Sequence, residues 1–324
     1  MSYRDRDNQP PLPKPYEFVP LPPGRPSTEP PAGHHRYREG YLNGMLTATI
    51  IARSPVHVAS GLLEPTNNRQ YPMAKAHFRT GGKPAIPGTS LKGCIRSIVE
   101  AITRSSVQVT RARELSQDYK AREIRERDRR EQSARLDIAQ RIFGALGYQG
   151  MVRFGDAALE NGSTTIVPSV QLFRTHSESY NTYFDGREPR GRKFYMHGKL
   201  AQGSLPLEAC PIESRFGLRM DFENIAPGEL GLILIALGLG EKRFLPKLGG
   251  AKPACLGTIE VIDASLAALD THAAYGEFDT APETLELQPL LDAAKPQVLT
   301  MQLGKLADVL SWPREDRDCP DRNY

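Results

Sequence analysis

The segment Pro87–Arg96 combines a turn, two hydroxyl side chains and two cations in the order Pro-Gly-Thr-Ser-Leu-Lys-Gly-Cys-Ile-Arg. The proline and glycine indicate a turn, Thr89 or Ser90 can cap a helix, and the apolar residues that follow recur at helical spacing. A helix that starts here presents backbone N–H groups at its positive end, and Lys92 and Arg96 lie one turn apart on it. Such a place favours a phosphate. The alternative is an ordinary capped helix with two surface bases.

A second glycine-rich turn occupies Lys247–Gly257 and leads into residues that alternate like a strand. Gly249 and Gly250 let the backbone approach a ligand closely, and Lys247 and Lys252 supply positive charge. The turn matches neither the Walker phosphate loop nor the Gly-x-Gly-x-x-Gly dinucleotide fingerprint. Nucleotide-driven catalysis is therefore disfavoured.

Residues 175–199 mix aromatic and basic side chains with glycines. Aromatic rings stack on bases while arginines meet phosphates, so this composition suits single-stranded nucleic acid. The alternative is a hairpin whose aromatics pack inward, and Asp185-Gly186 as a hairpin turn favours a projecting ribbon. The residues concerned are Tyr183, Phe184, Arg187, Arg190, Arg192, Lys193, Phe194, Tyr195 and His197.

Other reactive side chains give weaker signals. The four cysteines, which are Cys94, Cys210, Cys255 and Cys319, lie far apart without a Cys-x-x-Cys pair, so neither a zinc knuckle nor a disulfide is predicted. His34-His35 lacks a third ligand nearby, and we expect a solvated loop and no bound metal or other cofactor. Asp156 has no second carboxylate at close spacing, so it more often holds a turn or an arginine than does acid/base chemistry.

Composition places the chain among ordinary globular proteins. Its 324 residues are 39% hydrophobic and 25% charged, enough for a sizeable core, and the net charge of +4 permits a polyanionic partner without requiring one. No apolar run is long enough for a membrane span, and the start, Met1–Asp7, has no apolar stretch. We expect a cytoplasmic protein without a membrane partner.

Regular elements begin near Tyr41. Residues 46–52 alternate and are rich in β-branched types, which predicts a strand, followed by a long basic loop that reaches Ala85. Further strands are predicted at 150–157 and 214–224, and the apolar run 230–240 is a buried strand or helix. In the tail we expect a short helical piece at 264–269 and an amphipathic segment at 299–310.

The most charged block is 104–141, where cations and anions alternate with few apolar residues. Mixed signs indicate a solvated helix supported by neighbouring ion pairs. Such a helix either contacts nucleic acid or simply faces water. Before Tyr41 the chain is rich in proline, which predicts an extended arm that docks on a neighbour or on its own domain through Tyr16–Pro22.

Three motifs in this order resemble the RAMP superfamily of CRISPR-associated proteins: a strand with Ser54–Gly61 after it, the turn and helix at Ile86–Arg96, and Leu248–Gly257. The pair Phe143-Gly144 and Val152–Ala157 also resembles that family. The resemblance covers roughly residues 15–262.

The resemblance implies an α+β fold with a modified ferredoxin-like, RRM-type antiparallel sheet and helical and β-hairpin insertions. We expect an extended arm at 1–38, a core at 39–262 with the charged helix (104–141) and a thumb hairpin (175–199) inserted, and a C-terminal extension at 263–324. It further implies a backbone subunit that polymerises along a CRISPR guide RNA, in a type III-like, antiviral effector complex. Its partners would be the guide, complementary target RNA, further copies of itself, a capping subunit and other CRISPR subunits.

The same resemblance assigns roles to residues. The Pro-Gly-Thr-Ser-Leu-Lys-Gly turn and the late glycine-rich loop would hold guide phosphates, and the thumb would press into the guide–target duplex. The guide-binding residues it implies are Ser54, His57, Ser60, Thr89, Ser90, Lys92, Arg96, Lys247, Gly249, Gly250 and Lys252.

One departure bears on catalysis. Type III subunits that cut target RNA carry an aspartate in the loop after the first strand, whereas here Glu64 is the one carboxylate between Ser54 and Pro87. A non-catalytic subunit that relies on a separate nuclease, as in type VII systems, is therefore expected. The alternative is an endoribonuclease acting on target RNA or guide precursor, with His57 and Glu64 as its acid/base pair and His77 nearby.

Overall fold

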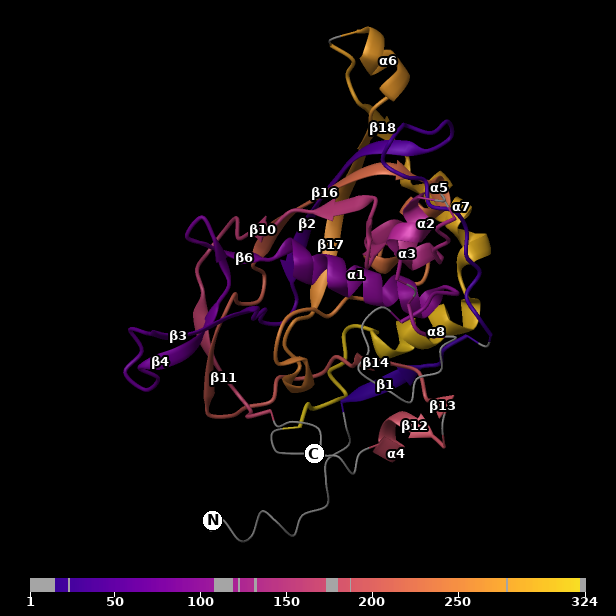
Figure 1. Cartoon of the computed structure of the whole chain (residues 1–324). Helices are drawn as coiled ribbons and strands as arrows, with labels where there is room; N and C mark the ends of the chain where they lie inside the picture. Colours follow the sequence, from indigo (N-terminus) through magenta and orange to yellow (C-terminus); the bar gives the residue numbers. More distant parts are fainter. Residues whose placement is uncertain are drawn as a thin grey trace.

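The computed structural model describes residues 15–22, 24–107, 119–121, 123–130, 133–172, 180–186, 188–277 and 279–320. Its centre is a five-stranded antiparallel sheet with the order β18-β17-β2-β16-β9 (Figure 1). The strands are β2 (Leu42–Ala52), β9 (Val152–Phe154), β16 (Arg215–Ile225), β17 (Ile259–Ala268) and β18 (Glu283–Leu285). Within the described residues the strands predicted at 46–52, 150–157 and 214–224 are confirmed.

Two helices complete a ferredoxin-like unit. Between the strands lie α1 (Gly88–Ile102) and α5 (Pro227–Ala236), so the chain order is β2-α1-β9-β16-α5-β17. In the sheet these four strands lie side by side in the order β17-β2-β16-β9, which is the strand order of a ferredoxin-like, split βαβ fold. The predicted fold class is confirmed.

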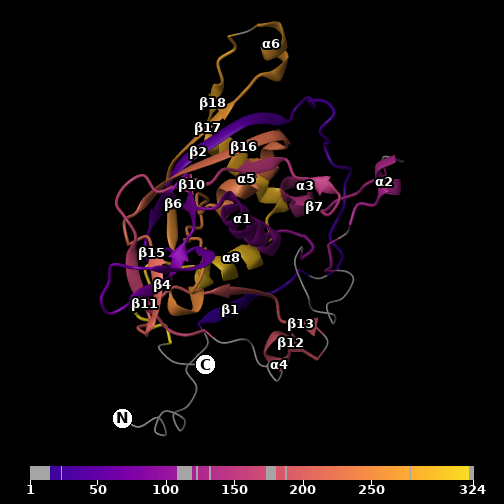
Figure 2. The ribbon, with the colours of Figure 1, turned by 60° about the vertical axis from the view of Figure 1, so that its left-hand side comes forward.

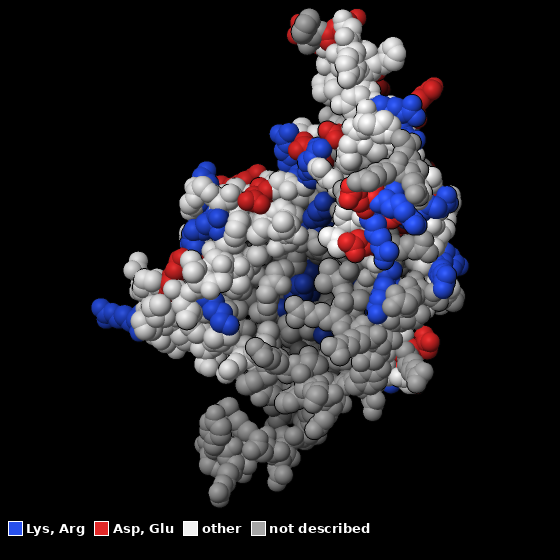
Figure 3. Space-filling view, in the orientation of Figure 1, with Lys and Arg blue, Asp and Glu red and all other residues white. Residues whose placement is uncertain are grey.

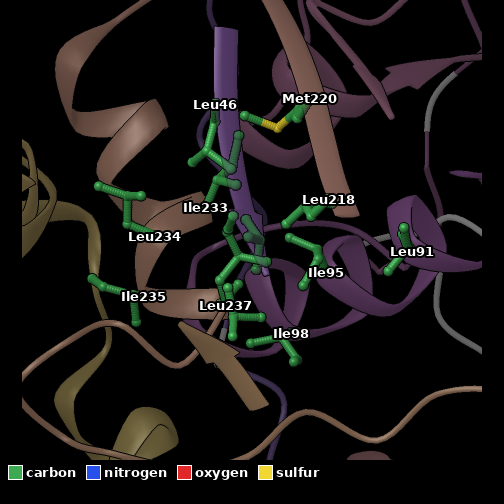
Figure 4. Close-up of a cluster of buried hydrophobic side chains, with 14 of the residues drawn as sticks. Leu46, Leu91, Ile95, Ile98, Leu218, Met220, Ile233, Leu234, Ile235 and Leu237 are labelled. Atoms are coloured by element: carbon green, nitrogen blue, oxygen red, sulfur yellow. The ribbon is translucent and has the colours of Figure 1, made fainter. Parts of the chain in front are cut away.

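The core forms because the apolar face of the sheet packs against α1 and α5. Alternate residues of β2 and β16 are buried, so one face of the sheet is apolar. Side chains of α1 and α5 pack against it, as Figure 4 shows for Ile95, Ile98 and Ile233 beside Leu218 and Met220 of β16. The apolar run at 230–240 is therefore a helix buried on all sides, and a left-handed Gly238 (φ +84°) follows its end.

A second sheet was not predicted from the sequence. Its order is β11-β15-β4-β3, and it replaces the long loop expected before Ala85 with a projecting hairpin (Figure 2). The face toward the body carries small side chains such as Ala74 and Ala76, both buried, so the strand pattern has little apolar contrast. The strands are β3 (Ala59–Pro65), β4 (Met73–His77), β11 (Thr165–Ser169) and β15 (Leu205–Ala209), with β5 (Arg79–Thr80), β6 (Lys83–Ile86) and β10 (Ala157–Ala158) beside them.

The N-terminal arm docks on its own domain. Its strand β1 (Tyr16–Val19) pairs antiparallel with β14 (Arg192–Tyr195). Before β14 lie α4 (Tyr180–Tyr183) and a small hairpin of β12 (Phe184–Asp185) and β13 (Glu188–Pro189) that turns at Gly186. The turn predicted at Asp185-Gly186 is thus present, whereas Arg187 and residues 173–179 lie outside the described residues.

The charged block is not one helix. Its described part holds α2 (Glu126–Arg130) and α3 (Ile138–Phe143), and residues 119–121, 123–125 and 133–137 between or before them are not helical. Asp137 caps α3 through a capping box with Gln140, so a new helix starts there. Residues 108–118, with Arg111 and Arg113, lie outside the described residues. The short pair β7 (Gly144–Ala145) and β8 (Tyr148–Gln149) follows.

In the C-terminal part, the prediction for residues 264–269 is wrong and the prediction for residues 299–310 is confirmed. Residues 264–268 continue β17 instead of forming a helix, because they pair with β2 and bury Leu266. Within the hairpin to β18 lies α6, which projects from the body (Figure 1). The amphipathic segment near 299–310 is confirmed as a helix. The remaining elements are η3 (Lys252–Ala254), α6 (Thr271–Gly276), α7 (Leu287–Ala294), η4 (Lys295–Gln297) and α8 (Thr300–Val309).

A disulfide joins Cys255 to Cys319, whose Cα atoms lie 5.9 Å apart. It corrects the expectation that the cysteines stay unpaired, because the fold brings residues 64 positions apart side by side. The tail that carries Cys319 also forms a β-bridge between Lys199 and Asp318. Within the described residues, none of the helices has the length and apolarity to cross a bilayer.

Candidate nucleic-acid interface

A groove of about 780 Å³ brings three segments together that lie far apart in the sequence. They are the start of α1, the glycine-rich turn after Lys247, and the segment around β14. In Figure 3, Lys and Arg atoms lie in the hollowed centre of the face that Figure 1 shows with α1 across it. Predicted site residues among the groove's lining are Thr89, Ser90, Tyr183, Phe184, Arg192, Lys193, Phe194, Tyr195, Lys247, Gly249, Gly250 and Lys252.

The turn before α1 is closed by a carboxylate from another strand region. The backbone N–H of Gly88 donates to Asp156 Oδ1 at 2.8 Å, and neither Thr89 nor Ser90 caps the helix, which corrects that prediction. A side chain at Gly88 would overlap the carbonyl oxygen of Phe154, so only glycine lets α1 approach β9 this closely. Asp156 therefore already balances part of the positive end of α1.

The two cations of this motif have partners within the chain. Lys92 Nζ donates to the carbonyl oxygen of Val152 at 3.1 Å, and burial lowers its pKa. Arg96 Nε lies 2.7 Å from Glu100 Oε1. Arg192 of β14 forms an ion pair with the same buried carboxylate. Glu100 thereby ties β14 to α1, and what α1 leaves open to the groove is its hydroxyl residues, with Thr89 exposed.

The glycine-rich turn is built by close backbone approach. The N–H of Gly250 donates to the carbonyl oxygen of His57 at 2.7 Å. Gly249 is left-handed (φ +83°), and a side chain there would overlap that same oxygen. The turn thus rests directly on the chain segment that follows β2, which joins two of the predicted motifs.

Its two lysines differ in burial. Lys247 is buried, its Nζ donates to the carbonyl oxygen of Met196 at 2.7 Å, and desolvation, helped by the charge of Lys252, lowers its pKa to about 7. Lys252 is half-buried on the groove, and its side chain makes no hydrogen bond or ion pair with the residues that the structure describes. Lys252 is the cation that this turn offers to a ligand.

The aromatic and basic segment packs partly on the arm. Lys193 Nζ lies 4.7 Å from the ring centre of Tyr16, 5.2 Å from that of Tyr183 and 4.9 Å from that of Tyr195. A cation among three aromatic faces is stabilised, and these contacts fix the strand pair of β1 and β14. Of the other thumb residues, Arg190 is exposed, while His197 is buried with its ring nitrogens 2.9 Å from Thr258 Oγ1 and 3.0 Å from the carbonyl oxygen of Leu245.

The polar side chains of the first motif, Ser54–Gly61, bond to other parts of the protein. Ser54 Oγ accepts from the N–H of Thr258 at 2.9 Å, and Ser60 Oγ donates to the carbonyl oxygen of Ala76 at 3.2 Å. His57 is buried with Nδ1 2.6 Å from the carbonyl oxygen of Glu208, and burial lowers its pKa. Glu64 is exposed on β3. No hydrogen bond or ion pair joins His57 to Glu64 in the described residues.

Sequence spacing could not reveal several residues that hold the site. Glu208 accepts from the N–H of His77 at 2.8 Å and pairs with Arg79, which together hold the pKa of its carboxyl down at about 2 despite burial. Asp156 and Glu100 are likewise long-range partners. For Asp156 the signal was its place after a strand and a glycine. Among the described residues, no cluster of three or more His, Cys, Asp or Glu side chains has a geometry that could hold a metal ion.

Fold and groove together define an RRM-type α+β protein with a groove lined by glycine backbone, hydroxyls, cations and aromatic rings. The family model of the RAMP superfamily matches residues 49–254. The chain belongs to the RAMP superfamily, which indicates a CRISPR-associated, RNA-binding protein. No curated protein matches the sequence.

Proposed function

We propose that this chain is a backbone subunit of an RNA-guided CRISPR effector complex, which binds guide RNA in the groove and holds the guide–target duplex. The observation that carries the proposal is the convergence of three distant segments on one groove of about 780 Å³. Each segment supplies a different kind of RNA contact. Hydroxyls and a helix start suit phosphates, glycine backbone suits close approach, and aromatic rings suit bases.

The proposed contacts follow from the residues that line the groove or are exposed beside it. Phosphates would meet Thr89, Ser90 and Lys252, while Tyr183 and Phe184 beside β14 would face bases of the duplex, and exposed Arg190 would meet its backbone. Lys92, Arg96 and Arg192 would act indirectly, because they fix the walls of the groove through Val152 and Glu100. Further copies would stack along the guide, and a capping subunit would end the row.

A non-catalytic role fits the burial of His57 and the exposure of Glu64. RNA cleavage through the 2′-hydroxyl needs a base and an acid aligned on one ribose. A separate nuclease would then cut the target, as in type VII systems, whose backbone subunits resemble inactivated type III ones. Such a complex would serve antiviral defence.

The alternative, an endoribonuclease acting on target RNA or guide precursor, is favoured by one observation. His57 is neutral and keeps Nε2 without a hydrogen-bond partner in the described part of the chain, as a general base requires.

The experiment is to purify the chain with co-expressed guide RNA and to add labelled complementary RNA, with and without divalent metal. Protection of both strands at full length is expected. Cuts at regular intervals that vanish in His57→Ala would replace the scaffold by the enzyme. Recovery of the chain without any RNA would overturn both.

A further inference from the structure

Two buried histidines lie side by side beneath the glycine-rich turn, with ring centres 6.1 Å apart. His77 has both nitrogens occupied: Nδ1 accepts from the N–H of Val58 at 3.2 Å, and Nε2 donates to the carbonyl oxygen of Ala85 at 3.1 Å. Its pKa is lowered to about 4, chiefly by burial. His77 is therefore a neutral, satisfied part of the fold.

His57 is held as the opposite tautomer. A carbonyl oxygen can only accept, so the 2.6 Å contact with Glu208 requires a proton on Nδ1. Because burial keeps the ring neutral, Nε2 carries a lone pair. Nε2 has no hydrogen-bond partner among the residues that the structure describes, although the residue is only 3% exposed. Nε2 is not among the fully buried polar atoms of the described residues that lack a partner, so it is an acceptor that a bound molecule can reach.

The free edge of this ring faces Gly250. A Cβ at Gly250 would lie 3.2 Å from His57 Cδ2 and 4.0 Å from Nε2, so the missing side chain leaves that edge uncovered. Gly250 itself lines the groove, and Lys252 lies two residues further on. A backbone that passes over Gly250 thus meets an acceptor beside a cation.

The charged neighbours of His57 are few. Lys75 acts to lower its pKa and Glu208 to raise it, and the neutral His77 packs against the ring. The Glu208 carboxylate is itself taken up by Arg79, Thr164 and the N–H of His77. None of these neighbours donates a hydrogen bond to Nε2, so the acceptor is available to a bound molecule.

We propose that His57 Nε2 accepts the hydrogen bond of a ribose 2′-hydroxyl on the strand that passes over Gly250, so that this residue makes the groove select RNA over DNA. The inference rests on the proposed binding of guide RNA in the groove. A deoxyribose lacks the hydroxyl, so a DNA strand over Gly250 would cover this acceptor without giving it a hydrogen bond. Gly250 serves as the opening through which the sugar reaches the ring.

The test compares a guide RNA with the same strand carrying single 2′-deoxy positions, in binding to purified wild type and variants. His57→Asn keeps a donor for Glu208 and removes the acceptor, whereas Gly250→Ala keeps the acceptor and covers it. In wild type, a 2′-deoxy substitution at the contacted position should cost about tenfold in affinity. Both variants should bind the guide RNA and the 2′-deoxy strand equally, with the weaker affinity that wild type has for the 2′-deoxy strand.

Gly93→Ala is the matched control. Gly93 also lines the groove, but nothing lies within 4 Å of an added Cβ there, so the preference for ribose should persist. Thermal unfolding of each variant separates loss of the fold from loss of the contact.

The outcomes separate the two proposals. Wild type that binds RNA and the deoxy strands equally overturns the role of His57 while the proposed function stands. Wild type that binds no RNA overturns the proposed function itself. Cleavage at the contacted ribose that is lost in His57→Asn would make Nε2 a general base and overturn its role as a reader of the sugar.

Discussion

The two glycine turns that border the groove differ in what satisfies their polar groups. At the start of α1, Asp156 accepts a hydrogen bond from the N–H of Gly88, Lys92 donates to a backbone carbonyl, and Arg96 forms an ion pair with Glu100. In the turn after Lys247, the N–H groups of Leu248, Gly250 and Gly257 donate to backbone carbonyls, but the Lys252 side chain and the Nε2 of His57 beneath it are without partners among the described residues. Both turns looked alike as phosphate sites in sequence.

The difference indicates a division of labour. A turn whose cations are taken up internally holds elements in place, because moving any of them would break hydrogen bonds inside the protein. A turn with an open cation and an open acceptor can exchange water for a ligand at little cost. We therefore assign anchoring to the first turn and contact to the second.

The largest effect should follow from Gly88→Ala. The new Cβ would overlap the carbonyl oxygen of Phe154, the last residue of β9, which pairs with β16 in the main sheet, so unfolding should become easier by about 3 to 5 kcal/mol. Urea unfolding followed by circular dichroism measures this. Gly93→Ala in the same helix has open space and should stabilise by up to about 1 kcal/mol. Equal stability of the two variants would contradict the anchoring role.

The second turn should depend on the C-terminal tail. Cys255 follows it directly and is joined to Cys319 across 64 residues, a loop whose closure is worth about 4 kcal/mol in the chain-entropy account. Cys319→Ser, or reduction of wild type, should lower the free energy of unfolding by about 2 to 4 kcal/mol. Cys94→Ser, at a free half-buried thiol, is the control. Insensitivity of the wild type to reductant would show that the tail does not hold the turn.

How far sequence alone reaches follows from these same residues. Periodicity predicted α1, β2 and β16, because each buries one face against the same core and so carries a regular apolar repeat. It missed the hairpin of β3 and β4, whose inward residues are small, and it took residues 264–268 for a helix because alanine and leucine favour helices unless a neighbouring strand pairs with them.

For the site, residue types predicted which segments meet but not which side chains stay open. Lys92, Lys247 and Lys252 are equivalent in sequence, and only the fold supplies Val152 and Met196 as acceptors for the first two. The partners lie 60 and 51 positions away, which no local pattern records.

The buried lysine of the second turn should make stability depend on pH. Lys247 has a pKa of about 7 when folded and about 10.4 when unfolded, so between these values the unfolded chain binds the extra proton. Its contribution to stability therefore rises with pH across this window, by up to about 1.4 kcal/mol per unit, and is constant below it. Urea unfolding at pH 7, 8 and 9 should show this rise in wild type and a flatter profile in Lys247→Met. An unchanged slope in the variant would contradict the burial of a charge here.

The smallest effect is the one that separates the two turns most directly. Lys252→Met keeps the stem of the side chain and removes the open cation, so guide RNA should bind about fivefold more weakly, with the salt dependence reduced by about one counterion and the stability unchanged. Lys92→Met should do the reverse: it should leave RNA affinity nearly unchanged and cost about 1 kcal/mol of stability, since it orphans the carbonyl of Val152. Binding titrations at several salt concentrations measure the RNA affinity of both variants, and unfolding curves measure their stability. If both variants weakened RNA binding equally, the start of α1 would also be a contact surface, and the distinction between anchor and contact would fall.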